Sequence, residues 1–127
     1  MFHVKRLISS GSPYEDRLGY SRAVVAGDWC FVSGCTGADA DGGFPAGIAD
    51  QARNALGVIE QALTAAGFTL SDVVRVQYTV TDRALVDDLA PVLATAFGSI
   101  RPAATMVFAD LIHPAMVVEI EVTALRA

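Results

Sequence analysis

Two glutamates near the C-terminus are the residues best placed to do chemistry. In the segment VVEIEVTAL, residues 117–125, apolar side chains alternate with Glu119, Glu121 and Thr123, which is typical of a β-strand. Successive side chains of a strand point to opposite faces, so both carboxylates should share one face, about 7 Å apart along the strand. A face open to water would give the pair no role. A face covered by another subunit would desolvate at least one glutamate, raise its pKa and make it a plausible proton shuttle.

The other reactive side chains fit structural roles as well as chemical ones. Ser33 lies at a predicted strand end before a glycine, where a turn explains it about as well as a substrate contact does. His3 and His113 are isolated, and we expect both in loops or at the surface. Cys30 and Cys35 are expected to be reduced thiols in or near the core. The spacing gives no catalytic triad, zinc ligand set or phosphate-binding glycine loop, so we expect no metal and no cofactor.

Length and composition limit the class of protein. The 127 residues suit one domain spanning residues 1–127. Hydrophobic residues make up 53% and charged residues 18%, more apolar material than a monomer hides easily, so we expect subunit contacts. The net charge of −5 and the lack of a basic stripe argue against binding to nucleic acid. No apolar run approaches the roughly 20 residues that span a bilayer, and no signal peptide is recognisable, so we expect a cytoplasmic protein.

The N-terminal half should form a hairpin, a loop and a long helix. The segment AVVAGDWCFVSG, residues 23–34, is typical of two strands that turn at Gly27-Asp28. The segment 37–47 is rich in glycine and aspartate and indicates a loop. Apolar residues at helical spacing predict a helix over 48–66, which Gly67 would end in a left-handed conformation.

The C-terminal half should alternate strands with a second helix. We expect strands over 72–80, with Val74, Val76, Tyr78 and Val80 on one face, and over 105–109 and 117–125. A helix is expected from about 87 to 97, capped by Asp87 or Asp88, so that Pro91 falls in its first turn. The order of elements predicts an α+β fold in which two helices pack on one face of a mixed sheet.

Short segments along the whole chain also carry a family resemblance. In chain order they are GYSRAV (19–24), FVSG (31–34), Gln51, AAG (65–67), SDVVRV (71–76), Asp82, FG (97–98), RPAAT (101–105) and VEIEVTA (118–124). Each segment alone is weak, but their order and spacing are specific. On these segments the chain resembles the RidA/YjgF family of reactive intermediate deaminases, whose older name is endoribonuclease L-PSP.

The resemblance implies a fold, an assembly and an activity. The fold would be chorismate-mutase-like, and the assembly a homotrimer with clefts between subunits. Members of the family hydrolyse enamines and imines, such as 2-aminoacrylate and 2-iminopropionate, to keto acids and ammonia. By correspondence, Glu119 would position the attacking water, and Tyr20 and Ser33 would line the cleft.

One family residue is missing from the motif that starts at Pro102. In deaminating members an arginine of this motif pairs with the substrate carboxylate, for which a guanidinium fork is well suited. This chain has Ala104 there, followed by Thr105 and by Met106 where cysteine is common. We therefore expect weak activity on ordinary 2-imino acids. Arg101, or Arg22 where the family usually has glutamine, could replace the anchor, or both could be surface or intersubunit charges.

Two functions of different classes remain open from the sequence. The first is a diverged hydrolase of imines, enamines or related C–N compounds, with water positioned by Glu119. The alternative is a non-catalytic trimer that binds a small metabolite or a protein partner, which the alanine at position 104 favours. RNA cleavage has little support, because the charge is unsuitable and no histidine pair is available for acid–base work.

Overall fold

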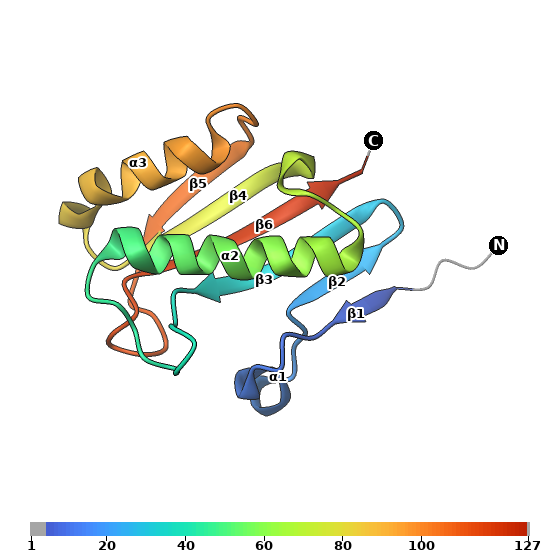
Figure 1. Ribbon diagram of the computed structural model, residues 1–127, viewed down its shortest axis with the longest axis horizontal. Coiled ribbons are helices and arrows are strands. Elements are labelled where there is room, and N and C mark those ends of the chain that lie inside the picture. Colours follow the sequence, from blue (N-terminus) through green and yellow to red (C-terminus); the bar gives the residue numbers. More distant parts are fainter. Residues whose placement is uncertain (1–4, 127) are drawn as a thin grey trace.

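A six-stranded sheet forms the centre of the computed structural model, which describes residues 5–126. The strand order is β1-β2-β3-β6-β4-β5, and all neighbours are antiparallel except the parallel pair β4–β5. The bounds of the elements are β1 Arg6–Ile8, α1 Pro13–Leu18, β2 Ala23–Ala26, β3 Trp29–Thr36, α2 Ile48–Ala66, β4 Val73–Val80, α3 Val86–Phe97, β5 Ala103–Phe108 and β6 Val118–Leu125, with short 3-10 helices at Leu70–Asp72 and Arg83–Leu85 (Figure 1).

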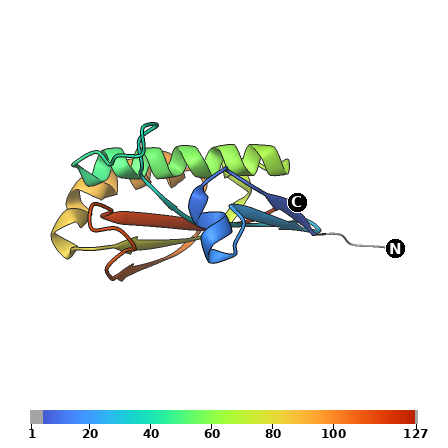
Figure 2. The ribbon, with the colours of Figure 1, turned by 90° about the horizontal axis from the view of Figure 1, so that it is seen from below.

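Helices α2 and α3 lie on the same side of the sheet, as Figure 2 shows. Every apolar position that the helical spacing assigned to the core side of α2 is buried, and Gly67 ends the helix with φ of 84°. Ile59 and Leu63 are fully buried in the core with Val76 of β4 and Ile120 of β6. The predicted α+β fold with two helices on one face is confirmed.

The start of β4 differs from the expected alternation. A register shift lies between Val73 and Arg75 where β4 pairs with β6, which is typical of a β-bulge. The bulge buries Val73 and leaves Val74 exposed, so the prediction that Val74 shares a face with Val76 is wrong. Strand β5 begins at Ala103, two residues before the expected start. The short elements β1 and α1 were not predicted.

The start of α3 also differs from the prediction. The N-cap residue is Leu85, which makes no side-chain cap, while Asp82 caps the preceding 3-10 helix by accepting from the Ala84 amide. Asp87 and Asp88 lie within the first turn of the helix, so neither is the cap. Pro91 is therefore inside the helix and removes one helical hydrogen bond. It lies on the exposed side, where water can satisfy the carbonyl that lost its donor.

The other face of the sheet, opposite α2 and α3, carries the two glutamates. Glu119 pairs with Thr79 of β4 and Glu121 with Gln77, while the apolar residues that alternate with them on β6 are buried. Phe31 of β3 pairs with Thr123 and stacks on Trp29, with ring centroids 6.2 Å apart. These two rings are 47% and 42% exposed. In the described chain this face of the sheet is open.

Within residues 5–126, no helix has both the length and the apolar character that a membrane crossing requires. The same residues include no cluster of three or more histidine, cysteine or acidic side chains that could hold a metal ion.

Candidate functional site

A β-bulge in β3 brings Glu119 against the backbone of Gly34. The pairing of β3 with β6 shifts register between Val32 and Cys35, and Ser33 and Gly34 occupy the shift. A Cβ atom at Gly34 would stand 2.5 Å from the carboxyl carbon of Glu119. Only glycine therefore allows the glutamate its position, which explains why the sequence has glycine in the middle of a strand.

Glu119 lies in a pocket of about 420 Å³ that contains half of the predicted site residues. Its lining residues are Ser12, Tyr14, Leu18, Tyr20, Arg22, Ser33, Gly34, Thr36, Ile112, Met116, Glu119 and Glu121. The pocket thus brings together the glutamate pair and the two residues, Tyr20 and Ser33, that the resemblance assigned to a cleft. It also includes three residues from α1 and the turn before it, which the sequence analysis did not connect with the site.

The environment of Glu119 raises the pKa of its carboxyl group. Burial raises the pKa of this carboxyl above its ordinary value of 4.5, the charge of Glu121 raises it further, and Arg22 opposes the shift. This is the perturbation expected if one glutamate of the pair were desolvated. In this structure the protein's own chain covers Glu119 in part, whereas Glu121 is exposed.

Arg22 is buried and connects the walls of the pocket. Its guanidinium donates to the Gly34 carbonyl at 2.8 Å, to the Tyr20 hydroxyl at 3.3 Å and to the Cys35 sulfur at 3.4 Å. The expectation that Arg22 is a surface charge is wrong, because its side chain is 8% exposed. It lines the pocket, but most of its N–H groups are occupied by acceptors of the protein, which leaves little for a substrate carboxylate.

Glu15 is the buried counter-charge of Arg22. Its carboxylate lies 3.9 Å from the Arg22 Nε and accepts hydrogen bonds from both the amide and the hydroxyl of Ser10 and from the Ser9 hydroxyl. Burial opposes ionisation of Glu15, but the bonds from Ser10 and Ser9 and the charge of Arg22 together lower its pKa below 4.5. The pair is therefore ionised inside the protein, where losing either partner is costly.

Helix α1 contains Glu15 and fixes the position of the Tyr20 backbone. Its sequence contains a signal for a helix N-terminus. The Ser12 hydroxyl accepts from the Tyr14 amide, Pro13 stands at the first position, and Gly19 ends the helix in a left-handed conformation. The amide of Tyr20 then bonds to the Glu15 carbonyl at 3.0 Å. Ser-Pro followed by acidic residues is the signal that could have revealed this helix.

Ser33 and Cys35 have structural bonds at the pocket wall. The Ser33 hydroxyl donates to the Ser21 carbonyl at 2.7 Å, so a ligand could use it only as an acceptor. Burial raises the pKa of the Cys35 thiol to about 11, although Arg22 opposes the shift. Cys30 and Cys35 are both buried and free, as expected, and a thiol so hard to ionise is a poor nucleophile.

Ala104 and Arg101 lie apart from Glu119, in a different pocket of about 380 Å³. Residues from β4, β5 and α3 line that pocket, among them Tyr78 and Phe97, and none of its lining residues is shared with the Glu119 pocket. Met106 packs partly buried against the core on the same strand, while the Thr105 hydroxyl accepts from Arg75 at 3.4 Å on the open face. Within one chain, the expected anchor position and the expected water-positioning residue do not meet.

Arg101 has an unusual backbone. Its φ of 60° lies in the left-handed region, where an L residue other than glycine is strained by about 1–2 kcal/mol. Its amide donates to the Phe97 carbonyl at 2.8 Å and so completes the end of α3. Its side chain is exposed at the rim of the Ala104 pocket, which leaves it free for other partners.

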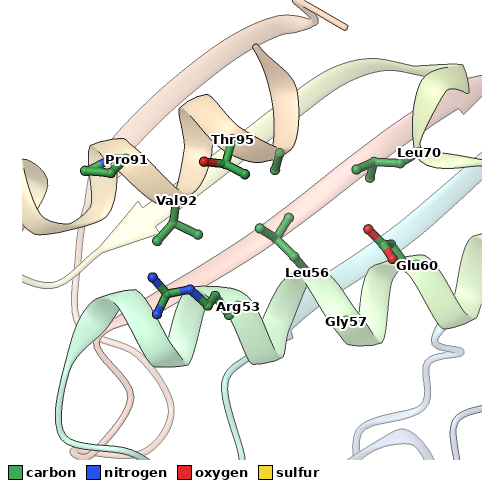
Figure 3. Close-up of a pocket in the computed structure, with 9 residues that line it drawn as sticks. Arg53, Leu56, Gly57, Glu60, Leu70, Pro91, Val92 and Thr95 are labelled. Carbon is green, nitrogen blue, oxygen red and sulfur yellow. The ribbon is translucent and has the colours of Figure 1, made fainter. Parts of the chain in front are cut away.

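A groove between α2 and α3, on the other side of the sheet, is larger than both of these pockets (Figure 3). It has a volume of about 610 Å³ and an apolar floor that includes Leu56 and Val92. Arg53 at the groove pairs with Asp50 at 2.8 Å, but the two side chains are 62% and 67% exposed. Charges so well solvated are weak candidates for catalysis.

The remaining histidine candidate is structural. His113 is exposed in the loop before β6, stacks on Phe44, and its Nδ1 accepts from the Ala115 amide at 3.0 Å. His3 lies outside the described residues.

Comparisons with known proteins show the family of this chain and agree with its fold. The model of the Endoribonuclease L-PSP family matches residues 14–126. A RutC family protein of Pyrococcus horikoshii is 32% identical over 109 residues, which are 84% of this chain and 86% of that protein. A crystal structure of a YjgF/YER057c/UK114 family member from Mycobacterium tuberculosis is 44% identical, with a TM-score of 0.89, over 97% of this chain and all of that one. The structure of Escherichia coli TdcF with bound serine is 25% identical, with a TM-score of 0.80, over 96% of this chain and 94% of that one. The chain therefore belongs to the RidA/YjgF family, which the L-PSP model describes.

Proposed function

We propose that this protein is a hydrolase of small imines, enamines or related C–N compounds, and that Glu119 positions the attacking water. The observation that supports the proposal best is the placement of Glu119. It is partly desolvated over Gly34, its pKa is raised, and it shares a pocket with the hydroxyl side chains of Tyr20 and Ser33. A carboxylate with a raised pKa is a better general base near neutral pH than an ordinary surface glutamate.

The reaction would use these groups in a simple sequence. Glu119 accepts a proton from water as the water oxygen bonds to the C=N carbon, and the π electrons move to nitrogen. The proton then passes from Glu119 to that nitrogen, which gives a carbinolamine. Glu119 next takes the proton of the new hydroxyl group and passes it to the same nitrogen, so that the C–N bond breaks, the hydroxyl becomes a carbonyl and ammonia leaves. Tyr20 and Ser33 would orient the ligand beside Glu119. No oxidation or reduction takes place, so the chemistry requires only water.

We further propose that the working cleft lies between subunits of a homotrimer. Two features support this assembly: the open sheet face carries exposed Trp29 and Phe31, and the Ala104 pocket is separate from the Glu119 pocket in one chain. A neighbouring subunit could bring the two pockets together. Light scattering should give three times the mass of one chain, and the mass of a monomer would contradict the proposal.

The alanine at position 104 leads us to expect weak activity on ordinary imino acids. Because this residue cannot pair with a carboxylate, ammonia release from enzymatically generated 2-iminopropionate should exceed the spontaneous rate only weakly, and Ala104→Arg should raise it about tenfold or more. Full activity of the native protein would mean that another group, with Arg101 first, anchors the substrate. If neither protein releases ammonia faster than the spontaneous reaction from any imine tested, the hydrolase proposal fails.

The second candidate is a non-catalytic module that binds a small metabolite or a protein partner. Ala104 again supports it, and TdcF, a relative of the same fold, has been crystallised with bound serine. A binder should show ligand-induced thermal stabilisation with no product. An increase in melting temperature that is accompanied by turnover would instead favour the hydrolase.

A further inference from the structure

The pocket around Glu119 has an excess of negative charge. Glu119 and Glu121 both line it, and among the described lining residues Arg22 is the one cation. Within residues 5–126, neither glutamate has an ion-pair partner within 4.0 Å. A ligand that enters the pocket therefore meets two carboxylates whose charge is not neutralised by a direct contact.

Arg22 does not balance these carboxylates for a ligand. Its own charge lies against Glu15, with 3.9 Å between Nε and the nearer carboxylate oxygen. One terminal nitrogen of the guanidinium donates to both the Gly34 carbonyl and the Cys35 sulfur, which uses both of its N–H groups. A carboxylate therefore cannot bind both terminal nitrogens in the bidentate arrangement that makes arginine a strong anchor. The side chain is 8% exposed, which also limits access to it.

Position 104, where the resemblance leads us to expect an arginine that pairs with the substrate carboxylate, supplies no charge either. Ala104 faces an apolar pocket, and Arg101 at its rim is the only cationic side chain among the described residues that line it. If a neighbouring subunit placed this pocket against Glu119, its lining would supply one cation at most. That cation is Arg101, whose backbone is strained.

We propose that the Glu119 pocket accepts small imines that have no carboxylate on the imine carbon, and that it favours their protonated, iminium form. The inference rests on the hydrolase function proposed above. An iminium cation is attracted by Glu119 and Glu121, and in a partly buried site this attraction is several times stronger than in water. The carboxylate of an imino acid is repelled by the same two groups. The products are an aldehyde or ketone and ammonium, and water remains the other reactant.

A matched pair of substrates tests the inference. A flavin amine oxidase converts benzylamine to phenylmethanimine, and an amino-acid oxidase converts phenylglycine to 2-imino-2-phenylacetate. The two imines differ in one carboxylate. Formation of benzaldehyde and of phenylglyoxylate is followed against spontaneous hydrolysis. We expect kcat/KM for phenylmethanimine to be about tenfold or more higher than kcat/KM for 2-imino-2-phenylacetate.

Charge variants show whether the pocket sets this preference. Glu121→Gln should reduce the ratio of the two kcat/KM values about threefold or more, because it removes one of the two carboxylates. Glu60→Gln removes the same charge from the groove between the helices and should leave the ratio unchanged. An unchanged ratio in Glu121→Gln would contradict the electrostatic origin of the preference.

The remaining outcomes separate this inference from the proposed function. Equal or faster hydrolysis of the imino acid overturns the inference and leaves the hydrolase function intact. If Arg101→Gly, which also relieves the positive φ, then abolishes that activity, Arg101 is the anchor. If neither imine is hydrolysed faster than the spontaneous reaction, the hydrolase proposal fails. Thermal shifts then decide the charge preference: benzylammonium should raise the melting temperature and benzoate should not, and the opposite result overturns the inference.

Discussion

The Glu119 pocket and the groove between α2 and α3 contain the same three residue types in opposite settings. Each has an arginine, a glutamate and a glycine: Arg22, Glu119 and Gly34 in one, and Arg53, Glu60 and Gly57 in the other. The groove is larger, about 610 Å³ against 420 Å³.

The environments of these residues differ far more than their identities. Arg22 is buried and contacts several acceptors, whereas Arg53 makes one exposed ion pair. Gly34 is covered by the Glu119 carboxyl, whereas a Cβ at Gly57 would meet nothing within 4 Å. The contrast teaches that desolvation and constrained partners, and not volume, indicate where chemistry can occur.

Substitution of the two arginines should give the largest difference in stability between the pocket and the groove. Arg22→Met leaves Glu15 buried without its cation and should lower the free energy of unfolding by about 3 kcal/mol. Arg53→Met breaks a pair that is mostly solvated and should change it by about 0.5 kcal/mol or less. Urea denaturation of both variants measures the contrast. Similar values for the two would show that Arg22 does not support the fold of the pocket.

The two glycines should separate activity from stability. Gly34→Ala places a methyl group where the Glu119 carboxyl lies, so the flexible side chain must turn away, and kcat/KM for an imine should fall about tenfold or more. Gly57→Ala has free space on a helix and should stabilise the protein by about 0.5–1 kcal/mol with no change in activity. Kinetics and thermal denaturation on both variants test this pair. An active Gly34→Ala protein would contradict the placement of Glu119 in the reaction.

The two perturbed glutamates should give opposite dependences of stability on pH. The pKa of Glu15 is lowered in the folded protein, so its contribution is present above its ordinary value of 4.5 and is lost as the pH falls through the folded pKa. Glu15→Gln should therefore be destabilised most near pH 7, with the difference from the native protein narrowing in acid. The pKa of Glu119 is raised, so ionisation of this group disfavours the folded state as the pH rises through the folded pKa.

Glu119→Gln should accordingly be more stable than the native protein near pH 7, and this gain should disappear below pH 4.5. Melting temperatures of both variants between pH 3 and pH 8 provide the measurement. The same trend in both would show that one of the two carboxyl environments has been assigned incorrectly.

Periodicity explains how much of this arrangement the sequence could predict. The alternation in 117–125 correctly places Glu119 and Glu121 on the face away from the helices, because the buried partners on β6 are all apolar. It could not reveal the bulges at Val74 and at Ser33-Gly34, since an inserted residue changes the side-chain direction without changing composition.

The periodicity of the sequence could not predict the ion pair and hydrogen bonds of Arg22. Its partner Glu15 lies in a helix of six residues, too short for a helical repeat to be visible, and the contact joins this helix to the residue directly before β2. An arginine in a sequence gives no sign of whether its donors will face water or buried acceptors. Ala104 was found by correspondence to a family motif, but its separation from Glu119 within one chain required coordinates.

The most direct test of the central claim is to compare Glu119→Gln with Glu60→Gln in the same imine hydrolysis assay. Both changes remove one carboxylate, but only the first lies in the proposed site. We expect Glu119→Gln to lose about 10²–10⁴-fold in kcat while remaining folded by circular dichroism, and Glu60→Gln to retain the native rate. Full turnover by Glu119→Gln would contradict the assignment of Glu119 as the residue that positions water.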